Sequence, residues 1–172
     1  MTEFEKYIQR YLNLIPSENW LEEMKIVCNQ TLEIYQSLTE GQSNFAYAEG
    51  KWTLKTLLEH LTDVEKIFQY RALRFARKDQ TELPGFNEEN YAENGTANQQ
   101  KLPSLIEEFH LNRLLSLAFF NKLTSEQLAQ KGKANGNEVS VETIGKLIVG
   151  HNIHHLNIIK ERYLPNLKFD SE

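Results

Sequence analysis

The sequence predicts an all-α protein, a four-helix bundle with a long crossover between the second and third of its long helices. Apolar residues recur at spacings of three and four along four long stretches, the period of a helix that buries one face. No stretch of any length alternates apolar and polar residues as a half-buried strand would, and no internal repeat is present. The 172 residues have the length of one ordinary domain, so we expect a single domain over 1–172.

The first long helix is expected to begin near Trp20, after a cap region around Ser17, and to end at Gly41. A shorter helix is expected before it, over 3–14. The apolar face of the first long helix is assigned to Leu21, Met24, Cys28, Thr31, Tyr35 and Leu38. We expect this face to pack against the other helices of the bundle.

The second long helix is expected from Thr53, whose hydroxyl can cap it, to about Arg77. Trp52, directly before the cap, is expected to pack against the first turn. Its apolar face is assigned to Leu54, Leu57, Leu58, Leu61, Val64, Phe68, Ala72 and Phe75. Arginines near the C-terminal end suit the negative end of the helix dipole.

Residues 79–100 follow without helical periodicity. A connection of that length is unusual in a compact domain, where about 4–6 residues are typical. Two roles are open for it. The segment can cross the bundle from end to end, which would leave the helices that it joins parallel, and it can cover a site.

The third long helix is expected over 103–123, with a proline in its first turn, and a short extra turn over 125–130. Its apolar side is assigned to Leu105, Ile106, Phe109, Leu114, Leu115, Ala118 and Phe119. The dipeptide Asn135-Gly136 predicts a turn or a small hairpin. Ser140 can cap the last helix, which is expected to run to about Tyr163.

Composition argues against several classes of protein. The chain has 24 acidic and 19 basic residues, a formal net charge of −5, which disfavours general binding to nucleic acids. Cys28 is the only cysteine, which excludes an intrachain disulfide and a cysteine-rich zinc site and fits a reducing cytosol. No apolar run approaches the roughly 20 residues that span a bilayer, and no signal-peptide core is visible. We therefore expect a cytoplasmic protein without nucleic-acid or membrane partners.

Two of the five histidines share one face of the last helix. His151 and His155 are four residues apart, in line with Ile144, Ile148 and Ile158, so both rings continue the apolar stripe into the bundle. Burying two imidazoles costs several kcal/mol unless each finds a partner, and one metal ion would satisfy both. The alternative is a pair of buried histidines without metal. His154 is expected on the flank of this face, nearer the solvent, where it is a candidate to contact a ligand ring or the substrate.

His60 lies on the inner side of the second long helix, in line with Leu57 and Val64. If that helix neighbours the last one, His60 completes a set of three histidines. Three protein ligands with open positions are typical of catalytic rather than structural zinc sites. Asp63, one turn further on, and Glu59 are candidates to orient a ligand ring. The alternative for both is an exposed helix charge, and this alternative is favoured for Glu59.

Other residues have plainer interpretations. Glu107-x-x-His110 is one copy of the motif of di-iron bundles, which need a second copy that the sequence lacks, so His110 is expected on the surface. Cys28 is expected to be a buried packing thiol, because no base or cation flanks it.

Taken together, these motifs resemble the DinB-like superfamily, which includes the YfiT-type metal-dependent hydrolases. The resemblance covers roughly residues 18–165. The motifs are Trp52-Thr53, His60-Leu61-Thr62-Asp63-Val64-Glu65, Tyr70-Arg71-Ala72-Leu73-Arg74, Leu83-Pro84-Gly85-Phe86 and Gly150-His151-Asn152-Ile153-His154-His155. Relatives often have an acidic residue where this chain has Asn87, which puts a carboxylate role for the loop in doubt.

The resemblance implies a bundle with one long crossover, frequent homodimers, and a divalent metal, nickel or zinc, on His60, His151 and His155. It also implies chemistry on a small-molecule substrate. Some family members attach low-molecular-weight thiols, such as bacillithiol or mycothiol, to electrophiles.

The first hypothesis is therefore a metal-dependent thiol S-transferase or hydrolase, in which the metal activates a thiol or water. Arg71 or Arg113 is a candidate to bind a carboxylate of the cosubstrate, with a plain surface or interhelical charge as the favoured alternative for both. The first long helix and residues 79–100 are expected to shape the pocket. The alternatives are a non-catalytic bundle that binds a metal or small ligand, and a structural dimer whose histidines are metal-free.

Overall fold

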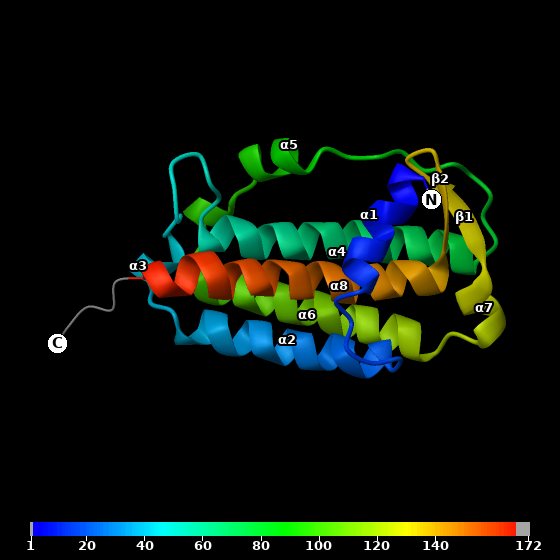
Figure 1. The fold of residues 1–172 in the computed structure, drawn as a ribbon, viewed down its shortest axis with the longest axis horizontal. Coiled ribbons are helices and arrows are strands. Elements are labelled where there is room, and N and C mark those ends of the chain that lie inside the picture. The colour runs from blue at the N-terminus through cyan, green and yellow to red at the C-terminus, as the bar shows by residue number, and fades with distance from the viewer. Residues whose placement is uncertain (1, 168–172) are drawn as a thin grey trace.

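The computed structural model describes residues 2–167, so the outermost residues of the expected domain lie outside it. Four long helices lie side by side (Figure 1), which confirms the all-α bundle. They are α2 (Trp20–Ser37), α4 (Leu54–Ala76), α6 (Leu102–Asn121) and α8 (Val141–Ile158). None of the helices in the described part combines the length and apolarity that a membrane crossing requires.

Short elements connect and extend the four long helices. The short α-helices are α1 (Glu3–Leu12), α3 (Glu40–Ser43), α5 (Glu88–Glu93) and α7 (Ser125–Ala129). The other elements are the 3₁₀ turn η1 (Ala97–Gln99), strands β1 (Lys131–Ala134) and β2 (Asn137–Ser140), the π turn η2 (Ile159–Tyr163) and the 3₁₀ turn η3 (Leu164–Asn166). The π turn prolongs α8 by one widened turn.

Helices α4 and α6 run parallel. Near their starts, Lys55 Nζ donates to the carbonyl of Gln100 at 2.8 Å, and beyond their ends Lys78 Nζ lies 2.9 Å from Glu126 Oε1. The chain between them returns along α4 through α5 (Figure 1). The crossover is long because a parallel neighbour can start only after the chain has travelled back along the bundle.

The crossover is anchored by Glu59 on α4. Its carboxylate accepts hydrogen bonds from the backbone N–H groups of Thr96 and Ala97, each at 3.1 Å. Glu59 is therefore neither a free helix charge, as the sequence favoured, nor a partner of a histidine, because both of its oxygens accept hydrogen bonds from the crossover.

Helix caps explain where the elements begin. The hydroxyls of Thr53 and Ser140 accept from backbone N–H groups at 3.1 Å, as expected for the caps of α4 and α8. The cap of α2 is Asn19, not Ser17. Gly41 does not end α2, because Thr39 already caps the next helix and leaves Gly41 inside α3.

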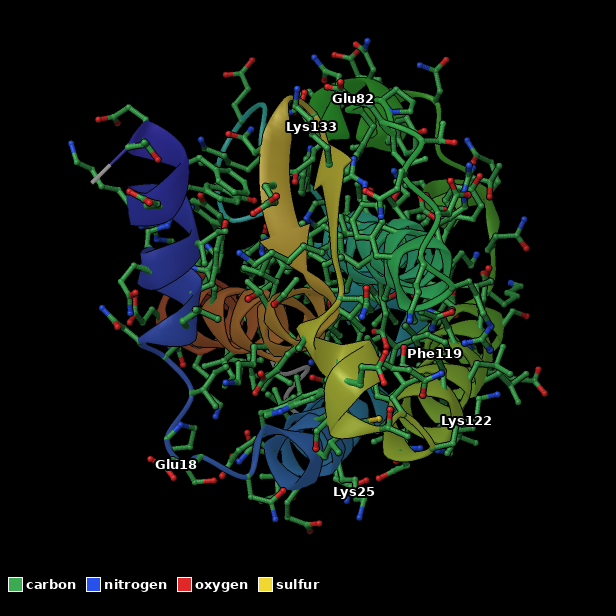
Figure 2. The ribbon with its side chains drawn as sticks, turned by 90° about the vertical axis from the view of Figure 1, so that its right-hand side faces the viewer. Glu18, Lys25, Glu82, Phe119, Lys122 and Lys133 are labelled. Atoms are coloured by element: carbon green, nitrogen blue, oxygen red, sulfur yellow. The ribbon has the colours of Figure 1, made fainter. Side chains whose placement is uncertain are left out.

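The hairpin forms at the end of the bundle that Figure 2 views. Asn135 and Gly136 take φ values of 50° and 76°, the left-handed turn that their dipeptide predicts. The crossover joins this hairpin, because Leu83 N donates to Lys133 O at 2.9 Å, and Lys133 Nζ lies 3.4 Å from Glu82 (Figure 2). A Cβ on Gly132 would lie 2.0 Å from the ring of Phe75, so glycine lets the hairpin pack closely on α4.

The centre of the bundle holds a buried ion pair. The guanidinium of Arg113 on α6 donates to both carboxylate oxygens of Glu65 on α4, at 2.8 and 2.9 Å. It also donates to the carbonyl of Met24 on α2 and to Asn152 Oδ1 on α8, each at 2.9 Å. One side chain thus links the four long helices.

The apolar side of α6 was assigned wrongly at Leu114, Leu115 and Ala118, which are exposed. Leu114 and Leu115 are 47% and 65% exposed, whereas Arg113 is only 1% exposed. Helix α6 carries apolar residues on two sides, so its periodicity does not identify the inner one. The inner side is the one that carries the partner of Glu65.

We expect the substitution Arg113→Met to lower the free energy of unfolding by about 3–5 kcal/mol, because Glu65 would be left as an unpaired buried charge. Urea unfolding followed by circular dichroism measures this. The double variant Arg113→Met, Glu65→Leu removes both charges and should lose less stability than the single variant. Equal losses in the two variants would contradict the importance of the uncompensated charge.

Candidate metal centre

Three histidines converge between α4 and α8. His60 comes from α4, and His151 and His155 come from successive turns of α8. Their Nε2 atoms form a nearly equilateral triangle, with separations of 3.1 Å for His60–His151, 3.2 Å for His60–His155 and 3.1 Å for His151–His155. Among residues 2–167, this is the group of three whose ligand atoms lie close enough to hold one ion.

Hydrogen bonding alone cannot satisfy this triangle. In a neutral imidazole, Nε2 is either a donor or an acceptor. Among three such atoms at least two have the same role, so at least one of the three close pairs is not a hydrogen bond. Nitrogens about 2.0–2.1 Å from a common ion lie about 2.8–3.0 Å apart in octahedral geometry and about 3.3–3.4 Å apart in tetrahedral geometry, which brackets the observed separations. The residues present therefore fit a divalent metal ion.

Burial keeps the three rings neutral. His60 and His151 are each 5% exposed, and His155 is partly buried. Burial lowers the pKa of His60 to about 4. Burial, together with His60, His154 and Arg10, lowers the pKa of His155 to about 2, and similar causes hold the pKa of His151 well below its usual value. A metal therefore meets free nitrogen lone pairs near pH 7 without displacing protons.

Aromatic rings surround the triangle. The ring centroid of Trp52 lies 4.8 Å from that of His60, and that of Tyr11 lies 5.8 Å from that of His151. Tyr11 can come this close because the neighbour of His151 is Gly150, where a Cβ would lie 2.4 Å from the Tyr11 carbonyl oxygen. Helix α1 therefore closes one side of the centre.

His154 lies beside the centre rather than in it. Its ring is half-buried, 5.4 Å from Tyr11 and 5.1 Å from His155 between centroids. This is the flanking position that the helical spacing indicated. Within the centre, His155 Nδ1 is buried without a hydrogen-bond partner in the described residues.

Two hollows reach the histidines, besides a small void at His151. One, of about 180 Å³, is lined by His155 together with Trp52, Glu89, Arg162 and Tyr163. The other is a narrow crevice lined by His60, Asp63, Phe86 and Tyr91. Residues of the 79–100 segment border both hollows, as expected. The expectation for the first long helix is wrong, because α2 lines neither of them and α1 lies beside the centre instead.

The other candidate site residues, Asp63, Arg113 and Arg71, differ in how close they lie to the three histidines. Asp63 borders the crevice beside His60, and its nearest cation is Lys66 at 4.0 Å; no hydrogen bond joins it to an imidazole in the described structure. The guanidinium of Arg113 is buried and hydrogen-bonded to Glu65, so it cannot reach a cosubstrate. Arg71 donates to the carbonyl of Pro84 at 2.9 Å and lines a separate cavity of about 370 Å³.

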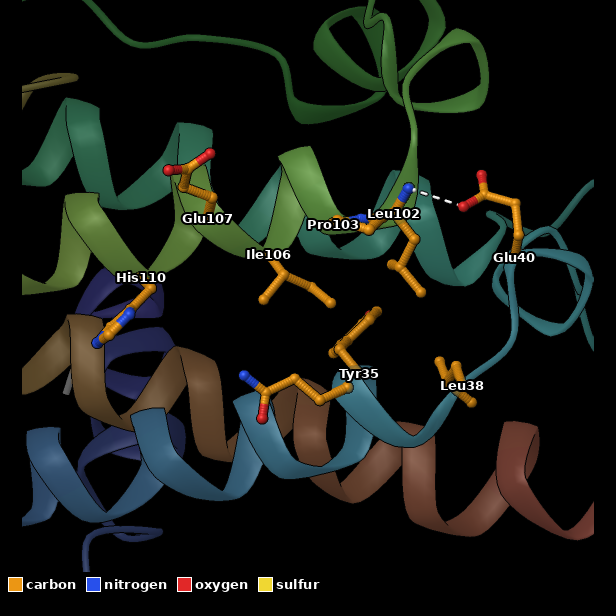
Figure 3. A pocket seen from close by; sticks show the side chains of 9 residues that line it. Tyr35, Leu38, Glu40, Leu102, Pro103, Ile106, Glu107 and His110 are labelled. Atoms are coloured by element: carbon orange, nitrogen blue, oxygen red, sulfur yellow. Dashed lines mark hydrogen bonds between the residues drawn. The ribbon is translucent and has the colours of Figure 1, made fainter.

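His110 lies on α6, outside the metal centre. It is exposed, as expected, and with Glu107 borders a hollow of about 710 Å³ between α2 and α6 (Figure 3). At the edge of that hollow Glu40 accepts from Leu102 N at 3.0 Å, which joins α3 to the start of α6. None of the three clustered histidines lines this hollow.

Comparison with known proteins identifies the family. The model of the DinB superfamily matches residues 24–159, most of the chain and all three histidines. The chain belongs to the DinB superfamily. Membership agrees with the resemblance drawn from the motifs.

Two relatives extend the comparison. A protein named "Putative metal-dependent hydrolase" from Oceanobacillus iheyensis is 30% identical over 145 residues, which cover 82% of each chain. The solved structure of YfiT from Bacillus subtilis superposes with a TM-score of 0.75 at 18% identity, covering 84% of this chain and 83% of that one. Its title describes a probable metal-dependent hydrolase with an unusual four-helix bundle topology. At that identity the match shows the fold alone.

Sequence reasoning missed Tyr11 and misjudged Trp52. Tyr11 lies in a short helix whose docking position no spacing reveals. Trp52 was expected only to pack against the first turn of its helix, yet it also covers His60. Its position before Thr53 and two turns before His60 was the available signal.

The metal-free protein should lose stability as the pH falls from about 6.5 towards 4. His60 has a pKa of about 4 when folded and about 6.5 when unfolded, so within this window the unfolded chain binds protons that the folded chain does not. The loss should approach about 1.4 kcal/mol per pH unit for each such histidine. Urea unfolding in a chelator between pH 7.5 and 5 measures it. The slope should be smaller in His60→Gln, and an unchanged slope would contradict the burial effect.

Proposed function

We propose that this protein is a metal-dependent hydrolase of a small molecule, with one divalent ion bound by His60, His151 and His155. The observation that carries the proposal is the triangle of Nε2 atoms, which hydrogen bonds cannot satisfy and which a cavity reaches. The name of the relative from Oceanobacillus iheyensis supports hydrolysis over other reactions. Nickel and zinc both suit neutral imidazole ligands.

The residues around the triangle have distinct roles in this proposal. A divalent ion with three protein ligands keeps open positions and lowers the pKa of a water or thiol that binds there. Trp52 and Tyr11 exclude bulk water from two sides of the imidazoles. The cavity at His155 admits the substrate. The cations Arg162 and Lys51 on its wall outnumber the one carboxylate there, Glu89, which favours an anionic substrate.

Asp63 is the proposed proton acceptor. Its carboxylate borders the crevice beside His60, and burial raises the pKa of Asp63, which makes it a stronger base than an exposed aspartate. His154, beside His155 but outside the triangle, is a candidate to position that ring. Neither residue is needed to hold the ion.

Transfer of a low-molecular-weight thiol remains the second candidate reaction. It would use the same three histidines and differ only in the nucleophile that is activated. The assay therefore has to offer both kinds of substrate.

We expect protein produced without a histidine tag to contain about one nickel or zinc ion per chain, measured by mass spectrometry, because three ligands converge on one point. The double variant His151→Ala, His155→Ala should lose the metal and all turnover. His110→Ala removes an exposed histidine elsewhere and serves as the matched control, which should retain both.

Turnover is measured on a panel of esters, amides and lactones, and on a thiol supplied with an electrophile such as monobromobimane. Turnover of the first group alone supports hydrolysis, and turnover of the second alone supports thiol transfer. A bound metal with no turnover of any of these would favour the non-catalytic binding bundle. Failure to bind nickel or zinc even after reconstitution would overturn the proposal.

We place this activity in the cytoplasm. The chain has a single cysteine, Cys28, which is buried as a free thiol, so nothing in its cysteine usage calls for an oxidising compartment. No nucleic-acid partner is proposed, because the formal net charge is −5.

We also propose a homodimer through α6. Leu111, Leu114 and Leu115 are 55%, 47% and 65% exposed on one side of this helix. Glu107 lies seven residues before Leu114 and Lys122 lies seven residues after Leu115, so both are equally far from the point midway between these two leucines. Two copies packed antiparallel about a two-fold axis would bury the leucines and place each Glu107 near the other Lys122.

We expect light scattering coupled to size exclusion to give the mass of two chains for the wild type and of one chain for Leu115→Glu, because the charge would lie at the centre of the interface. Ile26→Glu, which changes an apolar residue of similar exposure on α2, should remain dimeric. A monomeric wild type would refute this interface.

A further inference from the structure

A second cavity, of about 370 Å³, lies next to the metal centre. It is enclosed by α1, α4, the crossover, the hairpin and α8, and its volume is in the range of small-molecule sites, about 300–1,000 Å³. Most of its lining is apolar, with aromatic rings on three sides. The apolar wall is formed by Phe4, Tyr7, Phe68, Phe86, Val139 and Leu147.

The cavity extends away from the histidines along α4. Phe86 lines both this cavity and the crevice at His60, and Phe68 lines both this cavity and a small void at His151. Arg71 lies about three turns beyond His60, which is about 16 Å along the helix axis. No histidine of the described chain lines the cavity itself; its lining comes nearest to them along the chain at Leu147, one turn before His151 on α8, and at Phe68, about two turns after His60 on α4.

Arg71 is the unusual residue of this wall. Its guanidinium is half-buried, 5.7 Å from the ring centroid of Phe86, and donates one hydrogen bond, to the carbonyl of Pro84. No carboxylate forms an ion pair with it in residues 2–167, whereas Arg74, one turn further on, pairs with Asp79. A half-buried cation without a counter-ion is costly, and a bound anion would remove that cost.

A carboxylate of the chain is present in the cavity but does not neutralise Arg71. Glu88 also lines the wall, and its electrostatic neighbours are Glu89 and Arg10 rather than Arg71. Glu88 would repel a second negative group at its own side. The cavity is therefore matched to a ligand with one anionic end, directed at Arg71.

We propose that this cavity binds the part of the substrate remote from the reacting bond, an apolar or aromatic body that ends in a carboxylate held by Arg71. Calling the ligand a substrate rests on the proposed function, whereas the binding itself does not. Arg71 is then a specificity residue, since it contacts the ligand far from the proposed metal.

The test uses 4-phenylbutyrate as the probe and 4-phenylbutan-1-ol as its uncharged match. Calorimetry on the full-length, chelator-treated protein should give a dissociation constant at least tenfold lower for the acid than for the alcohol. In Arg71→Gln the acid should lose at least tenfold in affinity and the alcohol should change less than twofold. Arg74→Gln, whose guanidinium lies outside the cavity lining, should bind both probes as the wild type does.

Equal affinities of the acid and the alcohol for the wild type would overturn the inference without reference to any variant. Unchanged acid affinity in a folded Arg71→Gln, with folding checked by circular dichroism, would also overturn it. Because these measurements need no metal, their failure is distinct from failure of the proposed function. Turnover without preferential binding of the acid would contradict only the proposed carboxylate site at Arg71. Binding of the acid without turnover would contradict only the proposed enzymatic activity.

Discussion

The ion pair between Arg113 and Glu65 is the interaction on which the rest of the bundle depends. Both groups are almost fully buried, so each would be costly alone, and together they satisfy one another with two hydrogen bonds. The remaining donors of Arg113 reach α2 and α8. Its bond to Asn152 is the important one for the site, because Asn152 neighbours His151 in the chain and also donates to Thr31 on α2. This network sets the rotation of α8 about its axis, and that rotation turns His151 and His155 towards α4.

The parallel run of α4 and α6 has a functional consequence. It requires a segment that travels back along the bundle, and that segment lies over the side of α4 that carries His60. Glu59 binds the crossover at one end, and Leu83 pairs with β1 at the other. Fixed at both ends, the crossover contributes Phe86 and Tyr91 to the crevice at His60 and Phe86 and Glu88 to the neighbouring cavity. A connection that topology makes necessary therefore also forms the walls of the site.

In our proposals the metal centre carries the reaction, and the neighbouring cavity binds the part of the substrate that does not react. The three neutral imidazoles would hold the metal, and Trp52 and Tyr11 shield two sides of them from water. The cavity supplies apolar area and a single unpaired cation. Both depend on α1, a short helix outside the bundle, since Tyr11 closes the centre and Phe4 and Tyr7 close the cavity. Glycine at position 150 permits this docking.

The four long helices, the crossover segment, the hairpin turn and the three histidines were predictable from the amino-acid pattern alone. These depend on local physics: apolar periodicity, capping hydroxyls, a dipeptide that tolerates positive φ, and two imidazoles one turn apart. The same pattern misplaced the inner side of α6, the end of α2 and the role of Glu59. Those three features required the folded structure, because each depends on a partner far along the chain. Leucine at 114 and 115 and arginine at 113 are compatible with either orientation of α6, and the choice came from Glu65, 48 residues away. Likewise, nothing near Tyr11 or Arg71 in the chain reveals that one lies beside a histidine triangle and the other faces a cavity without a counter-ion.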